Sequence, residues 1–333
     1  MRDAILITGG AGFIGSEVTR QLASASRRVI VVDNMVNGRR ENLSGAGDGV
    51  TIEVADIRDA ARMRALMGDV ATVLHLACLG VRHSIHSPRE NHDVNATGTL
   101  TLLAAAREAG VDRFVHVSSS EVYGTARWVP ISEEHPTYPE TVYGASKLAG
   151  ECYARACYRT YGLPTVVVRP FNTYGPRCHH EGDSGEVIPR FMLRCLAGQP
   201  MVIFGDGRQT RDFTYVADTA RGIIAAAGTE ELVGETVNLG SGIEVSVADL
   251  ARLVALAADK PGAPVTYDTA RPGDVRRLMA ETSKARQALG FTPSVTLEEG
   301  LKLLLAWYTN QPQSPAELLE HEQVRNWTIG KAD

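Results

Sequence analysis

The sequence lacks the features that mark membrane, secreted and nucleic-acid-binding proteins. No apolar run approaches the roughly 20 residues of a transmembrane helix, and residues 1–3 lead directly into a predicted strand, so we expect no signal peptide. The five cysteines are scattered without metal-ligand spacing, which favours reduced thiols and a cytoplasmic location. With a net charge of −5 and no long basic run, neither nucleic acid nor a membrane is an expected partner.

What remains is a chain of ordinary globular composition. It has 333 residues, of which 44% are hydrophobic and 22% charged, and it contains no internal repeat. This length suits one large domain or two closely associated ones. The first half alternates short apolar runs with helical patterns, which predicts parallel strands joined by right-handed crossovers.

The clearest motif is the stretch TGGAGFIG at residues 8–15, which follows the apolar run at residues 4–7. Gly9, Gly12 and Gly15 would let a pyrophosphate approach the backbone and the free N–H groups at a helix N-terminus. The spacing G-x-x-G-x-x-G differs from the usual G-x-G-x-x-G, so a tight turn without a ligand remains an alternative.

A second apolar run, residues 29–32, ends in Asp33. An aspartate at this strand end can accept hydrogen bonds from a ribose 2′-hydroxyl, and it would repel a 2′-phosphate. The pattern therefore favours NAD as the cofactor. Arg39 and Arg40 lie close by and keep NADP open as the alternative.

Two polar segments follow predicted secondary structure in positions that suit catalysis. The strand at residues 113–117 leads into SSSEVYG at residues 118–124, at the sheet edge where open α/β proteins bind ligands. Tyr143 and Lys147 begin a helix predicted over residues 143–161, and their four-residue spacing puts them on one helical face. A simple surface pair is the alternative interpretation of these two residues.

Several histidines and arginines admit both a structural and a functional interpretation. We interpret His75 as a hydrogen-bonded core residue and residues 179–181 (HHE) as a solvated loop, because adjacent histidines point in different directions. No metal site is predicted. Arg208 and Arg211 suit a diphosphate, with surface ion pairs as the alternative.

The motifs together resemble those of the extended short-chain dehydrogenases/reductases, in the group of nucleotide-sugar epimerases, dehydratases and decarboxylases. The resemblance covers most of the chain and rests on TGGAGFIG, Asp33, Asp56, SSSEVYG, YGASK, RPFNTYGPR, RDFTYVADTARG, NLGSG and RPGD. It implies a Rossmann domain with a doubly wound parallel sheet over residues 1–175, with returns near residues 212–240. It also implies a smaller C-terminal α/β domain over residues 176–333 for the sugar nucleotide, carried as a UDP or dTDP derivative.

The resemblance also assigns roles to individual residues. It implies Tyr143 as the catalytic base, with Lys147, Ser119, Ser120 and Glu121 completing the catalytic set. Residues implied to bind NAD are Gly9, Gly12, Phe13, Ile14, Gly15, Asp33, Asn34, Asp56, Ile57, Leu76, Ala77, Tyr143 and Lys147. Residues implied to bind the sugar nucleotide are Arg82, Asn172, Arg208, Arg211, Arg271 and Asp274. Helices near residues 92–109 and 143–161 would form a homodimer through a four-helix bundle.

A phenol with a pKa of about 10 is a poor base at neutral pH, but a neighbouring ammonium and a positive nicotinamide favour its phenolate form. In this group the base removes the proton of the sugar 4-hydroxyl while NAD takes the hydride from carbon 4. Epimerisation, 4,6-dehydration and decarboxylation all continue from the resulting 4-ketone.

Glu121 helps to discriminate between these reactions, because a carboxylate suits proton transfer at carbon 5. Ser-Ser-Glu resembles the Thr-Ser-Glu of UDP-glucuronate decarboxylases and of some 4,6-dehydratases, while Ser120 replaces the aspartate of dTDP-glucose dehydratases. Residues 118–120, with Arg82 or His83, would bind a sugar carboxylate. We place UDP-glucuronate decarboxylation to a 4-keto-pentose or to UDP-xylose first, with 4,6-dehydration and 4-epimerisation as alternatives. A non-catalytic NAD-binding sensor or structural protein is the alternative of another class.

Overall fold

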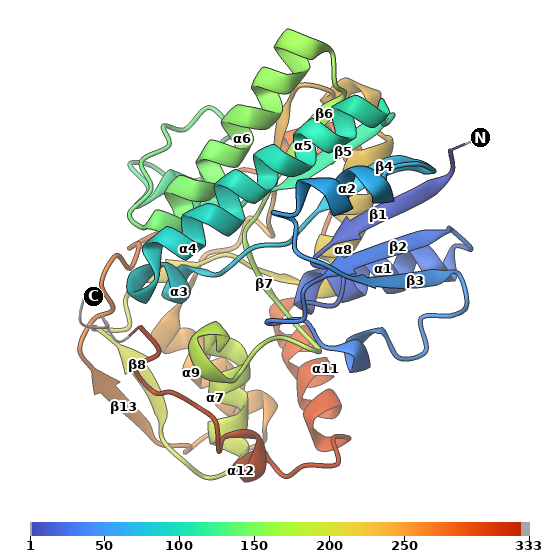
Figure 1. Ribbon diagram of the computed structural model, residues 1–333. Helices are drawn as coiled ribbons and strands as arrows, with labels where there is room; N and C mark the ends of the chain where they lie inside the picture. The colour runs from blue at the N-terminus through green and yellow to red at the C-terminus, as the bar shows by residue number, and fades with distance from the viewer. Residues whose placement is uncertain (1, 328–333) are drawn as a thin grey trace.

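The computed structural model describes residues 2–327 and is organised around a seven-stranded parallel sheet (Figure 1). The strands lie in the order β11-β6-β5-β4-β1-β2-β3. Their bounds are β1 (Ala4–Thr8), β2 (Val29–Asp33), β3 (Val50–Val54), β4 (Val70–His75), β5 (Arg113–Val117), β6 (Thr165–Pro170) and β11 (Thr236–Leu239). The chain winds outward in opposite directions from β1 and β4, which confirms the predicted doubly wound α/β fold.

Helices cover both faces of the sheet, and alternate strand residues point to different faces. Ile5 and Ile7 of β1 pack towards α1 (Phe13–Ser24) and α8 (Val216–Gly228). Leu6 packs in the opposite core, which includes side chains of α2 (Ala60–Leu66), α5 (Gly98–Ala109) and α6 (Val142–Tyr161). Burial on both faces explains why the central strands are continuous apolar runs.

The helix expected near residues 92–109 is divided in the structure. α4 (Pro88–His92) passes through a π-helical turn at Asp93–Thr97 into α5, which ends at Gly110 with a φ of 63°. In the turn, Asn95 accepts a hydrogen bond from the Leu79 N–H (2.8 Å) and donates to Ser146 of α6 (3.1 Å). The turn thus connects the loop after β4 to the helix that carries Tyr143.

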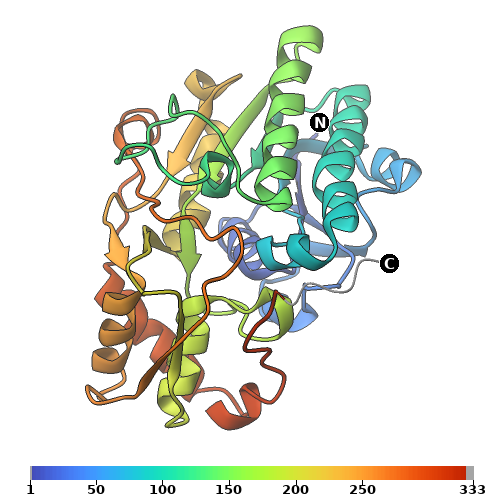
Figure 2. The same cartoon turned by 90° about the vertical axis from the view of Figure 1, so that its left-hand side faces the viewer.

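A second group of elements surrounds its own hydrophobic cluster, below the main sheet in Figures 1 and 2. Its helices are α7 (Val187–Leu196), α9 (Val247–Ala257), α11 (Leu297–Thr309) and α12 (Pro315–Leu318). Its strand pair joins β8 (Met201–Phe204) to β13 (Val265–Asp268). The domain division at residue 175 remains a prediction. The last six residues of the predicted C-terminal domain, 328–333, lie outside the described part of the chain.

The remaining elements connect these two groups. β7 (Asn172–Tyr174) pairs with β10 (Phe213–Tyr215), and β9 (Thr210–Arg211) pairs with β12 (Val245–Ser246). The helices among these remaining elements are α3 (Val81–His86) and α10 (Ser283–Leu289). All five cysteines are free thiols. Within residues 2–327, none of the helices has the length and apolar character needed to cross a bilayer.

Candidate active site

The carboxyl ends of the central strands border a cavity of about 430 Å³. This lies within the range of about 300–1,000 Å³ that is typical of ligand sites. Most of the residues implied by the resemblance line it. Of the NAD set, these are Gly9, Gly12, Phe13, Ile14, Gly15, Asp33, Asn34, Asp56, Ile57, Leu76, Ala77 and Tyr143. Of the others, these are Ser119, Ser120, Glu121, Arg82, Asn172, Arg211, Arg271 and Asp274.

The glycine turn is shaped to receive a phosphate. Gly9 has a φ of +69°, and a Cβ there would lie 2.7 Å from the Ala77 backbone nitrogen. A Cβ on Gly15 would lie 2.1 Å from the Gly9 carbonyl oxygen, so this close packing of turn and helix requires glycine. Gly12 caps α1 without any side-chain hydrogen bond, which leaves the first N–H groups of the helix available to an anion. The turn therefore fits the pyrophosphate of a dinucleotide.

Asp33 has a buried carboxylate at the end of β2. It accepts hydrogen bonds from the backbone N–H groups of Ala11 (3.0 Å) and Met35 (2.9 Å), which hold it at the cavity edge. Arg40 is exposed, and Arg39 forms an ion pair with Glu181. Neither arginine is among the residues that line the cavity. A negative group therefore faces the position expected for the ribose, which fits NAD.

Tyr143 lies in the first turn of α6, which begins after Thr141 caps it by accepting a hydrogen bond from the Gly144 N–H (3.2 Å). Burial raises the pKa of Tyr143 well above 10, and negative charge on Cys78, Glu121 and Glu186 raises it further. A hydrogen bond with Ser119 acts in the other direction. Burial and these neighbouring groups thus favour the neutral phenol, so a positive nicotinamide beside Tyr143 would help to favour the phenolate.

Lys147 lies one helical turn after Tyr143 but is only 1% exposed and does not line the cavity. Burial lowers its pKa, while Cys78 and Glu151 raise it. The surface-pair alternative is therefore wrong for this lysine. It is a desolvated ammonium behind the tyrosine.

Glu121 follows the carboxyl end of β5 in a short 3-10 turn. Its backbone N–H donates to the Ser119 hydroxyl (3.2 Å), but within residues 2–327 no group forms a hydrogen bond with its carboxylate. Burial raises the pKa of Glu121, and the charges of Arg211, Arg271 and Arg82 lower it. The result is a desolvated carboxyl that is free to exchange a proton with a ligand in the cavity.

Asp274 connects two of the four arginines of the substrate set, Arg211 and Arg271. Its carboxylate lies 2.7 Å from the Arg211 guanidinium and also forms an ion pair with Arg271. Arg211 donates in addition to the Val275 carbonyl (2.7 Å). This network presents both arginines to the cavity, where they can bind a diphosphate.

Arg208 does not belong to this network, contrary to the sequence-based expectation. It is exposed, its backbone N–H donates to Asp206 (3.0 Å), and its side chain has no hydrogen bond or ion pair within residues 2–327. It is not among the residues that line the cavity. The structure therefore does not support Arg208 as a substrate ligand.

Sequence reasoning missed Glu186 and Cys78, which both line the cavity. Burial raises the pKa of Glu186, whereas Arg82 and His179 lower it. The signal was available in part, because Glu186 follows closely after the HHE segment at residues 179–181 that we interpreted as a loop.

Two interpretations of histidines can be compared with the structure. His75 is fully buried between the hydroxyls of Thr8 (2.7 Å) and Thr99 (2.8 Å), which confirms it as a core residue. The interpretation of residues 179–181 as a solvated loop is wrong for His180, which is buried and lies 3.3 Å from Glu181, whose carboxylate also pairs with Arg39. The group of possible metal ligands lies elsewhere, at His83, His86 and Asp183.

The fold and this site define an extended short-chain dehydrogenase/reductase that uses NAD and acts on nucleotide sugars. Residues 6–304 match the family model described as GDP-mannose 4,6 dehydratase, and the chain belongs to that family.

Three comparisons represent the reactions found among its relatives. A putative UDP-glucose 4-epimerase of Methanocaldococcus jannaschii is 37% identical over 309 residues, covering 92% of this chain and 98% of the relative. UDP-glucuronic acid decarboxylase 1 of Xenopus tropicalis is 33% identical, covering 99% of this chain and 76% of the relative. The crystal structure of DesIV, a dTDP-glucose 4,6-dehydratase of Streptomyces venezuelae with NAD and TYD bound, has a TM-score of 0.88 and 33% identity. That match covers 92% of this chain and 97% of DesIV.

Proposed function

We propose that this protein is a nucleotide-sugar 4,6-dehydratase, in which Glu121 moves a proton between carbon 5 and the departing oxygen at carbon 6. The observation that carries the proposal is the buried Glu121 carboxyl, which has a raised pKa and no hydrogen-bond partner within the described residues. A simple 4-epimerase returns its hydride to the other face of the ketone and needs no second acid or base.

The reaction begins at Tyr143. Its phenolate oxygen takes the proton of the sugar 4-hydroxyl, with the Ser119 hydroxyl in contact and the Lys147 ammonium behind. Held by the glycine turn and Asp33, a bound NAD would supply the acceptor for the carbon 4 hydride and, once reduced, the hydride donor for carbon 6. The ketone that results makes the carbon 5 proton acidic.

Glu121 then completes the elimination. Its carboxylate takes the carbon 5 proton as the C5–H electron pair forms the double bond to carbon 6. The same carboxyl gives that proton to the 6-hydroxyl, which leaves as water. Tyr143 releases the proton of the 4-hydroxyl to solvent, and carbon 5 takes up one proton from solvent, so the protons balance. Because one carboxyl performs both proton transfers in this scheme, no second acid is needed at Ser120, the position of the aspartate in dTDP-glucose dehydratases.

Charge in the cavity favours a neutral sugar. Glu121 and Glu186 both have pKa values raised by burial, and Arg82 lies within the field of both carboxyl groups. The carboxylate of a glucuronate would be a third carboxyl group desolvated in this cavity, which is costly for a charged group. A neutral hexose avoids this cost.

Decarboxylation of UDP-glucuronate, which the sequence placed first, is the second candidate. The observation that favours it is the field of Arg82, Arg211 and Arg271 at Glu121. Together with the hydroxyls of residues 118–120, these cations could bind a sugar carboxylate and neutralise its charge.

Mass spectrometry in ²H₂O tests the proposal. The purified protein with NAD is incubated separately with dTDP-glucose, UDP-N-acetylglucosamine, UDP-glucose and UDP-glucuronate. We expect one of the neutral hexoses to lose water and to gain deuterium at carbon 5, and Glu121→Gln to lose this activity. Loss of carbon dioxide from UDP-glucuronate alone would establish the second candidate. A product of unchanged mass with an inverted carbon 4 would overturn both.

We also propose that the protein acts as a homodimer through α5 and α6. The two helices lie side by side on the outside of the sheet (Figure 1), and the Arg107 guanidinium lies 4.4 Å from the ring centre of Tyr161. Leu100 and Tyr161 are 45% and 58% exposed, so both offer apolar surface to a second copy of the chain. Sedimentation of the parent and of Leu100→Glu tests this, and a parent that sediments as a monomer at all concentrations contradicts it.

A further inference from the structure

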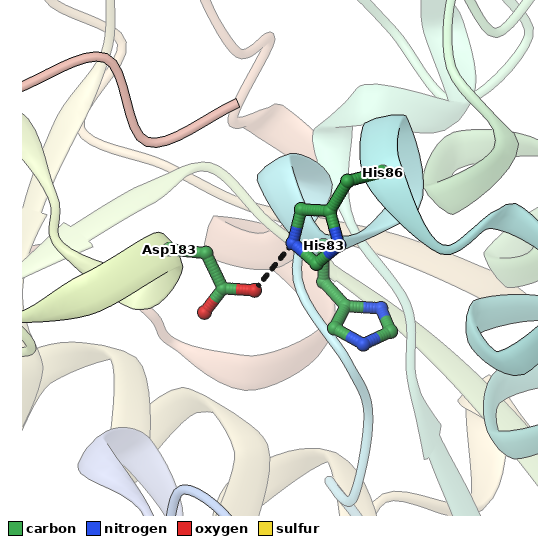
Figure 3. Close-up of side chains that lie close together, drawn as sticks. All are labelled: His83, His86 and Asp183. Carbon is green, nitrogen blue, oxygen red and sulfur yellow. Dashed lines mark hydrogen bonds and ion pairs between the residues drawn. The ribbon is translucent and has the colours of Figure 1, made fainter. Parts of the chain in front are cut away.

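We propose that His83, His86 and Asp183 form a binding site for a divalent transition metal of the zinc type. The site joins α3 to the short segment at residues 182–184 (Figure 3). It shares no residue with the proposed catalytic set, and it does not depend on which reaction the enzyme catalyses.

The three side chains already converge. One possible ligand atom from each lies within 4.8 Å of those of the other two. His83 and His86 are three residues apart on α3 and therefore share a helix face, with ring centres 4.9 Å apart. Asp183 approaches them from the opposite segment, and its carboxylate lies 2.9 Å from His86 Nε2. Figure 3 shows this carboxylate directed at the His86 ring.

The environment of His83 favours a ligand role. Its Nδ1 is buried and has no hydrogen-bond partner within residues 2–327. Its other nitrogen, Nε2, lies 3.4 Å from the Glu90 carboxylate. Metal-bound histidines usually donate their second ring N–H to a carboxylate, which orients the ring and increases its basicity. Glu90 is placed to serve His83 in this way, leaving Nδ1 for the metal.

The ligand set indicates which ions can bind. Two imidazoles and one carboxylate suit Zn²⁺, Co²⁺ or Ni²⁺, whereas Ca²⁺ and Mg²⁺ prefer oxygen ligands alone. Three protein ligands leave a fourth position for water. Metal–ligand distances of about 2.0–2.2 Å require the ligand atoms to close by roughly an ångström. The three half-buried side chains can make this change by rotation.

The position of the site gives it a structural consequence. Asp183 also lines the large cavity, and its neighbour Glu181 already pairs with Arg39, in the loop after β2. A metal at Asp183 would attach the same segment to α3 as well. Metal binding is therefore expected to stabilise the segment beside the cavity and to slow the dissociation of ligands bound in the cavity.

Binding of Co²⁺ and Zn²⁺ to chelator-treated full-length protein tests the proposal. We expect a single equivalent of Co²⁺ to give visible d–d absorption, and Zn²⁺ to displace it and to raise the melting temperature. His86→Asn and Asp183→Asn should each weaken binding by at least about 100-fold. Glu90→Gln should weaken it by about 10-fold, the effect typical of an outer carboxylate.

His92→Asn, at an exposed histidine of the neighbouring α4, is the matched control and should bind as the parent does. Retained NAD binding shows that each variant is folded. Absence of stoichiometric binding by the parent, or equal binding by the parent and Asp183→Asn, would overturn the proposal. So would a thiolate charge-transfer band in the Co²⁺ spectrum, because it would place the ion at a cysteine.

Discussion

Glu151 and Arg169 form a fully buried, two-point ion pair directly behind the candidate catalytic residues. Arg169 Nε and Nη2 lie 2.8 Å and 2.6 Å from the two oxygens of Glu151, and the Ser118 hydroxyl donates to the same carboxylate (2.6 Å). Glu151 belongs to α6 and Arg169 to β6. The pair therefore fixes the helix that carries Tyr143 against the strand ends that carry Ser119.

Glu151→Gln is expected to reduce the free energy of unfolding by about 3–5 kcal/mol, because it leaves the buried Arg169 charge without its counter-ion. Urea denaturation measures this. Arg155→Gln is the control, since Arg155 reaches Glu151 at 3.3 Å from a more exposed position and should cost less than about 1 kcal/mol. Equal losses for the two variants would contradict the importance of the buried pair.

Acid should destabilise the protein through its buried histidines. Burial lowers the pKa of His75 from 6.5 to about 3 and that of His116 well below 6.5. Above pH 6.5 both are neutral in the folded and unfolded chain, so no penalty arises. Below it the unfolded chain takes up protons that the folded chain refuses, and stability falls by about 1.4 kcal/mol per pH unit for each histidine.

The variant His75→Gln should therefore show a shallower loss of stability between pH 6.5 and about 3 than the parent. Urea midpoints measured across this range provide the test. His92→Gln, at an exposed position, should keep the parent's slope. Parallel pH profiles for the parent and His75→Gln would exclude this explanation.

Glu121→Gln should stabilise the protein while it removes the proposed proton transfer. The pKa of Glu121 is raised by burial, so its ionisation opposes folding once the pH exceeds the ordinary value of 4.5. The penalty is absent below that pH and complete above the raised pKa. The melting temperature of the variant should thus exceed that of the parent at neutral pH and equal it in acid.

Loss of the carboxyl should also reduce turnover by about 10²–10⁴-fold, the usual contribution of a general acid or base. A variant that is less stable than the parent at neutral pH would show that Glu121 has a partner that contributes to stability.

Tyr143→Phe should abolish substrate-dependent formation of NADH, since it removes the hydroxyl proposed to accept the proton of the sugar 4-hydroxyl. The absorbance of NADH follows this step before any later chemistry. Tyr158→Phe changes an exposed tyrosine on the same helix and should leave the formation of NADH unaltered. Persistent NADH formation in Tyr143→Phe would assign the base to another residue.

The local sequence was sufficient for the parts of the site that depend on backbone conformation. Gly9 and Gly15 allow a close packing of turn and helix that a Cβ would block, and Asp33 follows directly from the end of its strand. The helix predicted over residues 143–161 likewise followed from the local pattern, since α6 begins one residue earlier and ends at the same residue. Such features depend on neighbours that are close in the chain.

Only the tertiary structure decided which distant charges meet. Arg208 and Arg211 are equivalent on the sequence, yet the first is exposed while pairing of β9 with β12 directs the second to Asp274. His83 and His86 gain their possible metal ligand from Asp183, about a hundred residues later. The pKa of Tyr143 is likewise set by burial and by Glu186, from another element. Packing determines these encounters, because their energies depend on distance and desolvation, which sequence spacing does not encode.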